Sequence, residues 1–354
     1  MEFKVGDITF SNNHIRILAE AGVNHLGDLS LAEQLISAAK KSGADIIKFQ
    51  TYKASELTTR DAPRFWSWDG EKKKDGTQFD SYSNLDSFGR DEHEALKRIC
   101  DSYNIEFMST PFSSNAAEML ASIGMRCFKI ASCDITNLPF LHDIATFRLP
   151  IFLSTGASNI DEIKEAVNTI YEVSSNIPVC IMQCTLCYPT KPEDANLLML
   201  QDIQKHFPDN LLGLSDHTLG YHTPIVSVGL GARVIEKHFT VDKTLPDSAD
   251  HWLSVDPNEL SLLCKFTKEA LLNLGQSRKQ LVDCELATHS YARRSIVALN
   301  DIKAGRIISS HDISCKRPGT GLPPKKINLV IGAKAKNDIK ADTLINLEDL
   351  ILES

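Results

Sequence analysis

The stretches "GLSDHTLG" (residues 213–220) and "VIEKHF" (residues 234–239) decide the fold, because each has the form of a short strand that ends in a histidine. Six similar runs precede them, and each is short, apolar and rich in β-branched side chains, as is typical of strands. The eight predicted strands cover residues 15–22, 44–51, 105–112, 126–132, 150–157, 179–185, 211–217 and 232–239.

Helix-like segments separate these strands. Apolar residues recur at spacings of three and four in residues 31–43, 92–104, 115–125, 160–173 and 197–207. Eight strands that alternate with helices predict an α/β fold, a (β/α)8 TIM barrel. A doubly wound open sheet would also alternate, but the glycine fingerprint that often follows its first strand is missing here.

The composition changes after residue 275, where a polar segment follows the last helical pattern. Beyond it come short strand-like runs with glycine turns, and "NDIKAG" (300–305) and "NDIKAD" (337–342) form a weak internal repeat. We therefore predict a barrel over residues 1–280, a linker over 281–292 and a small β-rich domain over 293–354.

Charge and composition exclude several classes of function. The net charge of the 354 residues is -8 and no long basic block occurs, so nucleic-acid binding is not indicated, although a small anionic substrate stays possible. No apolar run is long enough to span a membrane. Nine cysteines without a signal peptide predict free thiols and a cytoplasmic location.

The connection over residues 52–88 is too long for an ordinary loop after the second strand. It follows a strand at the face where barrels of this kind keep their active sites. Two interpretations stay open: a partly disordered insertion, or a flap over the site that uses Phe65, Trp66 and Trp68.

Polar side chains are expected inside the barrel, toward the carboxyl ends of the strands. Residues two apart on a strand share a face, so Lys48 and Lys129 point inward together with their apolar neighbours. A buried lysine is costly unless it meets an anion. With hydroxyls from Thr110, Ser132, Ser154 and Ser215, the two lysines predict an anion pocket. The alternative for either lysine alone is a structural salt bridge.

The histidines His217 and His238 end neighbouring strands, so their imidazoles can converge. Two histidines with a carboxylate suit Mn²⁺, Fe²⁺ or Zn²⁺. The alternative is a pair of core histidines bonded to the backbone. Four acidic residues lie nearby in sequence, and spacing alone assigns none of them as a ligand: Asp216, Glu236, Asp247 and Asp250.

A single CxxC, "CTLC" at residues 184–187, ends another strand. No second pair accompanies it, and alternate side chains diverge at a strand end. We therefore interpret these cysteines as packing residues rather than as a zinc or redox site. The following Tyr188-Pro189 step is expected to shape a turn over the cavity.

Together these motifs resemble the sialic acid synthase family, whose members condense phosphoenolpyruvate with an N-acetylated hexosamine. The matching stretches fall in the family's order and cover nearly the whole chain: "AEAGVNHLGDL", "IIKFQTYK", "MSTPFS", "FKIASCD", "LSTGAS", "CTLCYPTKPEDANL", "GLSDHTLG", "EKHFTVD" and "KRPGTGLPP". The resemblance implies a TIM barrel followed by a small antifreeze-like (SAF) domain. It also implies a homodimer in which one chain's SAF domain closes the other chain's barrel.

The resemblance implies roles for individual residues. His217 and His238 would bind a divalent metal, usually Mn²⁺, with Mg²⁺ or Co²⁺ as substitutes, and Glu20 would lie near the reacting carbons. The phosphoenolpyruvate site would comprise Lys48, Thr110, Lys129, Ser132, Ser154 and Ser215. The sugar site would comprise Gln50, Asp134, Tyr188, Asp250 and, from the SAF domain of the partner chain, Arg317.

Departures from the family pattern concern the sugar. Asp134 stands where the family often has glutamate, and Leu186 where it often has asparagine or serine. One extra residue in "LPDSADH" makes Asp250 the equivalent of the family's acid. The expected aldose is N-acetylmannosamine or a modified relative, giving a sialic-type acid and phosphate. A different aldose, giving another 2-keto-3-deoxy sugar acid for surface polysaccharide, is the alternative. A non-catalytic homologue is disfavoured because the lysines and histidines are present.

Overall fold

The computed structural model describes residues 1–66, 76–246 and 250–352, and the chain divides into two compact units, Met1–Gly275 and Gln276–Ser354. The predicted boundaries at residues 280 and 293 remain predictions, and each unit is described by itself below.

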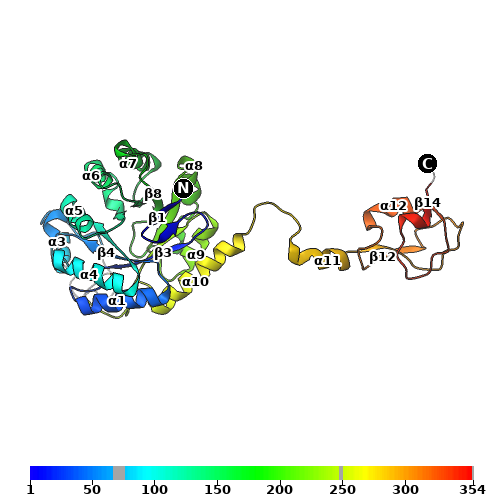
Figure 1. Cartoon of the computed structure of the whole chain (residues 1–354), viewed down its shortest axis with the longest axis horizontal. Coiled ribbons are helices and arrows are strands. Elements are labelled where there is room, and N and C mark those ends of the chain that lie inside the picture. Colours follow the sequence, from blue (N-terminus) through cyan, green and yellow to red (C-terminus); the bar gives the residue numbers. More distant parts are fainter. Residues whose placement is uncertain (67–75, 247–249, 353–354) are drawn as a thin grey trace. The chain divides into compact units, whose positions relative to one another are not determined.

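The first unit holds an eight-stranded parallel sheet ringed by helices (Figure 1). Its strands run in the order β5-β4-β3-β10-β9-β8-β7-β6, and β5 and β6, at the two ends of that order, lie against each other. The strands are β3 (Arg16–Gly22), β4 (Ile46–Thr51), β5 (Glu106–Pro111), β6 (Phe128–Ile130), β7 (Ile151–Ser154), β8 (Val179–Cys184), β9 (Leu211–Asp216) and β10 (Val234–His238). Every predicted strand is confirmed, and the fold is the expected TIM barrel.

One longer helix follows each strand. These helices are α1 (Leu29–Ser42), α4 (Arg90–Tyr103), α5 (Ser114–Ser122), α6 (Leu138–Thr146), α7 (Ile160–Val173), α8 (Met199–His206), α9 (His222–Gly229) and α10 (Pro257–Leu274). Local sequence sets their ends: Asp256 caps α10 by accepting from the Glu259 amide, and α1 ends at Gly43, whose φ of 94° suits glycine. Two short helices, α2 (Ala54–Leu57) and α3 (Gln78–Ser83), lie within the long connection after β4.

An N-terminal hairpin that the sequence pattern did not predict packs against the interior of the barrel. It comprises β1 (Phe3–Val5) and β2 (Ile8–Phe10). The ring of Phe10 stacks on Phe3 with centroids 5.1 Å apart and meets the edge of Phe152 on β7 at 5.2 Å. These rings share a cluster with Leu18 and Ile46, which lie two residues before Glu20 and Lys48. The amino-terminal half of the barrel interior is therefore apolar, which leaves its carboxyl-terminal half for polar groups.

The second unit is rich in short strands around its own apolar core. Its elements are α11 (Leu286–Tyr291), β11 (Ser295–Ala298), β12 (Ile313–Lys316), α12 (Ile327–Val330), β13 (Lys334–Ala335) and β14 (Leu350–Ile351). The internal repeat has a structural basis, because Ile302 and Ile339 exchange two backbone hydrogen bonds of 2.8 Å. Asp301 accepts from the Ala341 amide, and Asp338 accepts from the Ala304 amide. Each copy of the repeat thus holds the turn of the other.

No helix within the described residues is long and apolar enough to cross a membrane.

Candidate active site

A cavity of about 1010 Å³ opens at the carboxyl-terminal end of the barrel strands. It collects all of the residues predicted for the phosphoenolpyruvate site: Lys48, Thr110, Lys129, Ser132, Ser154 and Ser215. It also collects most of the other predicted site residues: Glu20, Gln50, Tyr188, Asp250, His217 and His238. This convergence follows from strand alternation in a closed parallel barrel, which aims side chains from different strands at one space.

Two predicted residues are not among the described residues that line this cavity. Asp134 is the last residue of the short 3-10 helix Ser132–Asp134, is half-buried and accepts a hydrogen bond from Asn137 at 3.2 Å. Arg317 belongs to the second compact unit, which is described by itself. Two residues considered in the sequence analysis, Trp68 for the flap and Asp247 as an acid near the histidines, lie outside the described residues.

Lys48 is held by a carboxylate and a hydroxyl inside the cavity. Strand register places Glu20 of β3 beside Lys48 of β4, and the ammonium nitrogen lies 2.7 Å from Glu20 Oε2. It also donates to the Thr110 hydroxyl at 2.9 Å. Burial by itself would lower the pKa of Lys48, but Glu20 and then Glu236 outweigh burial and raise it. Lys48 is therefore a fixed positive charge at the base of the site.

Glu236 is a site residue that sequence reasoning left unassigned. Its carboxylate lies between the two lysines, 3.6 Å from the Lys129 nitrogen and 3.8 Å from the Lys48 nitrogen, and accepts from the Ser215 hydroxyl at 3.0 Å. Burial would raise its pKa, yet Lys129 and Lys48 outweigh burial and lower it to about 2. The signal was present in the sequence, because Glu236 shares an inward face with His238.

The buried positive charge of Lys129 has fewer stabilising partners than that of Lys48. Within the described residues its nitrogen donates one hydrogen bond, of 3.2 Å to the Ile130 carbonyl, besides its attraction to Glu236. Burial lowers its pKa, and the attraction of Glu236 offsets only part of that effect. Close by in the same cavity, the buried Ser154 hydroxyl finds no hydrogen-bond partner within the described chain. A buried ammonium group with few partners and a buried hydroxyl group without one are both expected to bind a ligand.

The two histidines converge as predicted, with ring centroids 5.3 Å apart. His217 Nδ1 donates to the Thr185 carbonyl at 2.8 Å, which leaves its Nε2 for another partner. His238 Nδ1 lies 3.3 Å from Asp250 Oδ2 and makes no hydrogen bond within the described residues. Burial disfavours the charge on both groups, but each stabilises the other, so the pKa of His238 is raised and that of Asp250 is lowered.

The cysteines of the CxxC motif do not form a shared site. Cys184 is buried and lines the cavity, with its sulfur 3.8 Å from His217 Nδ1, whereas Cys187 is exposed. Both are free thiols. The next residue, Tyr188, precedes a cis proline, and its ring lies 4.1 Å from the His217 ring. The turn after β8 therefore brings an aromatic wall to the histidines.

The long connection after β4 also contributes to the cavity. Its described residues on the cavity wall include Leu57, Phe65, Trp66, Tyr82 and Leu85. Their rings form a chain, since Trp66 and Tyr82 lie 5.7 Å apart and Tyr82 meets Tyr52 at 5.5 Å. This placement supports the interpretation of residues 52–88 as a flap.

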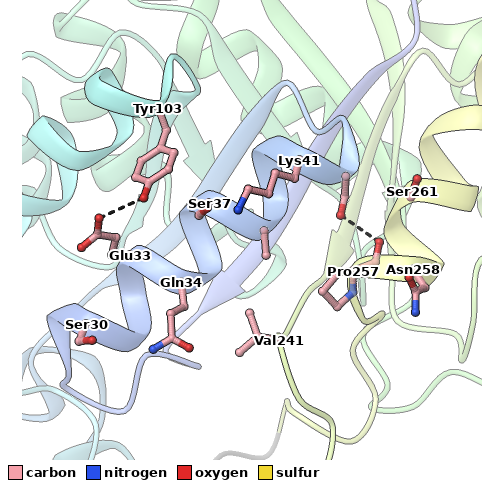
Figure 2. A pocket seen from close by; sticks show the side chains of 12 residues that line it. Ser30, Glu33, Gln34, Ser37, Lys41, Tyr103, Val241, Pro257, Asn258 and Ser261 are labelled. Carbon is pink, nitrogen blue, oxygen red and sulfur yellow. Dashed lines mark hydrogen bonds between the residues drawn. The ribbon is translucent and has the colours of Figure 1, made fainter.

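A second cavity, of about 650 Å³, lies between α1 and α10 (Figure 2). Figure 2 shows Tyr103 donating to Glu33, at 3.1 Å, and the Ser42 hydroxyl donates to the Pro257 carbonyl at 2.9 Å. No residue predicted for the site is among the described residues lining this cavity. Of these two cavities, the barrel cavity is therefore the one that holds predicted site residues.

Comparisons with known proteins agree with this architecture. The NeuB family model matches residues 35–279 and the SAF domain model matches residues 293–351. N,N'-diacetyllegionaminic acid synthase of Legionella pneumophila is 38% identical over 337 residues, covering 94% of both chains. Human N-acetylneuraminate-9-phosphate synthase is 33% identical, over 95% of this chain and 92% of its own.

A solved structure gives the same result. The crystal structure of the N-acetylneuraminic acid synthetase of Leptospira borgpetersenii has a TM-score of 0.72 and 35% identity, over 81% of this chain and 95% of its own. The family model spans most of the chain, and relatives above 30% identity cover nearly all of it. The chain therefore belongs to the NeuB family, as an enzyme whose synthase barrel is followed by a SAF domain.

Proposed function

We propose that this enzyme condenses phosphoenolpyruvate with an N-acetylated hexosamine and takes up one water, forming a nonulosonic acid and phosphate. The observation that carries the proposal is the convergence of two buried lysines, four hydroxyl side chains and two histidines in one cavity. The relatives support it, since they are named as synthases of legionaminic and N-acetylneuraminic acids.

Phosphoenolpyruvate would bind at the lysine end of the cavity. Its carboxylate and phosphate would take charge-assisted hydrogen bonds from Lys48 and Lys129, with the Ser154 hydroxyl free to donate. Glu20 and Glu236 hold the two ammonium groups before the substrate arrives. Fixing both anionic ends orients the reacting carbon C3 and removes much of the entropy cost of the bond-forming step.

A divalent metal, Mn²⁺ by preference, would sit between the histidines. Within the described residues no cluster of three His, Cys, Asp or Glu side chains forms a complete metal site. The converging His217 and His238 would be the protein's ligands, and water or substrate oxygens would take the open positions. The donor set fits, since the Thr185 carbonyl takes Nδ1 of the buried His217 ring and leaves its Nε2 to bind, and imidazole suits such ions. When bound, the metal would supply Lewis acidity toward the aldehyde oxygen.

Glu20 is placed to act near the reacting carbons. Its two oxygens are oriented by different partners, since Gln50 Nε2 donates to Oε1 at 2.9 Å and Lys48 lies at Oε2. Register also sets Glu20 beside His238 on the neighbouring strand. A carboxylate held between the lysine and histidine ends of the cavity can accept or return a proton where the new bond forms.

The preferred sugar would carry more than one acyl group. Phosphoenolpyruvate contains no nitrogen, so both acetamido groups of an N,N'-diacetyl product come from the aldose. Here Leu186 lines the cavity where it offers no hydrogen bond, and the flap adds Trp66 and Tyr82. An apolar wall of this kind favours the methyl group of a second acetamido substituent over a hydroxyl group. We therefore place plain N-acetylmannosamine below a modified aldose.

The functional unit would be a homodimer in which the SAF domain of one chain closes the barrel of the other, with Arg317 reaching the sugar. Mixing two inactive variants, Arg317→Ala and Lys129→Ala, tests this arrangement. Mixed dimers would contain one intact site, so part of the activity should return. If no mixture recovers activity, each site is built within one chain.

The activity itself is tested by phosphate release from phosphoenolpyruvate across a panel of aldoses, with and without Mn²⁺. The panel includes N-acetylmannosamine, its 6-phosphate, diacetamido hexoses and sugars without nitrogen. Metal-dependent release with an N-acetylated hexosamine supports the proposal. Release with only a sugar that lacks nitrogen would point to another 2-keto-3-deoxy acid.

A further inference from the structure

The two ends of the flap are tied to each other at its base. Lys53, two residues after the end of β4, donates to the Phe88 carbonyl at 3.2 Å and also to the Asp86 carbonyl. The Ala54 amide donates to the Asp86 carboxylate at 2.9 Å. These contacts join residues 53–54 to residues 86–88, so the long connection leaves and re-enters the barrel at one point.

The ring of Phe88 fastens this base to the barrel. It stacks on the imidazole of His25, with centroids 4.1 Å apart and planes within 14°, and it presents an edge to His93 at 6.3 Å. All three side chains are buried. Beside them, Gly27 has a φ of +75°, and a Cβ at that position would lie 2.6 Å from Ser87 Oγ. The loop after β3 and the end of the flap are therefore in close contact.

Burial keeps both histidines neutral, because it lowers the pKa of His25 and of His93. His25 Nδ1 accepts from the Gly27 amide at 3.1 Å, and burial lowers the pKa of His25 to about 4. His93 Nδ1 donates to the Gly89 carbonyl, and its Nε2 accepts from the Thr51 hydroxyl at 2.8 Å. Neutral rings pack on Phe88 without the cost of burying a charge. We call the packing of Phe88 against His25 and His93 the clamp.

The clamp is connected to the flap side of the cavity and not to its lysine end. The wall residues Leu57, Trp66 and Tyr82 lie on the described parts of the flap, whose two ends the clamp holds. Lys48 and Thr110, by contrast, lie on β4 and β5, whose backbones pair with each other in the sheet. A change in the clamp should therefore move the sugar wall and leave the lysine end intact.

We propose that Phe88, stacked on His25, is a positioning residue for the aldose. Phe88 is not among the described residues that line the cavity, and it acts by holding the flap wall against the sugar. The proposal rests on the proposed function for the identity of its ligand, but the clamp itself can be measured without any substrate.

The experiment compares Phe88→Ala with a matched control, Phe207→Ala. Phe207 is also 8% exposed and belongs to the same apolar core, but it follows α8 and lies outside the cavity lining. Both variants lose a similar buried ring, so both should melt at a lower temperature. Only Phe88→Ala should raise the KM for the aldose, by about tenfold, with less than about a twofold change in the KM for phosphoenolpyruvate. Phe88→Tyr, which keeps a ring on His25, should restore most of the aldose affinity.

A second readout needs no turnover. Trypsin should cleave within residues 52–88, at sites such as Arg60 and Arg64, faster in Phe88→Ala than in the wild type or in Phe207→Ala. Equal shifts of both KM values, an equal aldose effect in the control, or unchanged cleavage would each overturn the proposal. Faster cleavage in a protein that uses no N-acetylated hexosamine would retain the clamp but refute the proposed function and, with it, the role toward the aldose.

Discussion

The barrel and the C-terminal unit both set lysines opposite carboxylates, but in contrasting surroundings. The Lys48 and Glu20 side chains are 4% and 2% exposed, whereas Lys303 and Asp338 are 75% and 52% exposed. Exposed pairs cost little to form and contribute little to stability. Buried pairs carry a desolvation penalty that their mutual attraction often fails to offset. The barrel therefore keeps its charges inside for a reason other than stability, and binding an anionic substrate supplies one.

Removing the histidines should produce the largest effect. The double variant His217→Ala/His238→Ala should lose metal-dependent turnover, because no other histidine pair lines the described part of the cavity. The exposed His311 of the C-terminal unit provides the control, and His311→Ala should behave as wild type. Mn²⁺ binding measured by calorimetry should vanish only in the double variant. Full activity in a metal-free preparation would refute the metal assignment.

Lys129→Ala should weaken the use of phosphoenolpyruvate by more than about tenfold, since a charge-assisted hydrogen bond is worth about 1.5–3 kcal/mol. Lys303→Ala, the same substitution at an exposed pair, should change neither the kinetics nor the fold. Initial rates at varied phosphoenolpyruvate, with melting temperature as a check on folding, separate the two. An unchanged dependence on phosphoenolpyruvate in Lys129→Ala would make that lysine structural.

Glu236→Gln should destabilise the barrel by about 3 kcal/mol, because it leaves two buried lysines without their shared counter-charge. Asp338→Asn, the matching change in the C-terminal unit, should shift the melting temperature only slightly. Calorimetric unfolding of both variants provides the measurement. If both substitutions lower the free energy of unfolding by the same amount, burial does not make the Glu236 carboxylate more important for stability than the exposed Asp338 carboxylate.

Acid should weaken the barrel through His25. Because its pKa falls from 6.5 in the unfolded chain to about 4 in the folded one, the folded state disfavours the proton. The contribution of neutral His25 to the free energy of unfolding is complete above pH 6.5. It is lost as the pH falls toward 4, which lowers that free energy by roughly 2–3 kcal/mol. The three tryptophans all lie within residues 1–275, so urea unfolding followed by their fluorescence reports on the barrel.

The control for that experiment is again in the C-terminal unit. His25→Gln should flatten the loss of stability between pH 6.5 and 4, whereas His311→Gln should leave it unchanged. An identical pH profile for His25→Gln and the wild type would show that the proton is taken up elsewhere.

Leu186→Asn should give the smallest effect, a shift of a few-fold in sugar preference. An amide at this position can offer the sugar a hydrogen bond, which is worth about 1 kcal/mol. The ratio of kcat/KM for N-acetylmannosamine to that for a diacetamido hexose should rise. If N-acetylmannosamine is already the best substrate of the unaltered enzyme, Leu186 does not set the choice.

Much of the site was predictable because strand alternation is a strictly local rule. Lys48 and Lys129 could be assigned to the barrel interior from sequence, since each sits two residues from apolar neighbours on a predicted strand. Glu236 obeys the same rule, but local pattern does not reveal that its carboxylate lies between two lysines from other strands. The N-terminal hairpin was missed because its strands have only three residues each.

The sequence by itself determined the eight strands, five of the helices that follow them, the inward placement of the key polar side chains and the two-part organisation of the chain. These depend on periodicity and composition, which are written in neighbouring residues. Only the tertiary structure decided how the charges pair, which cavity receives them, and that Phe88 joins His25 to the base of the flap. Those features join residues far apart in sequence, and their energies depend on burial and on distances that exist only once the barrel has closed.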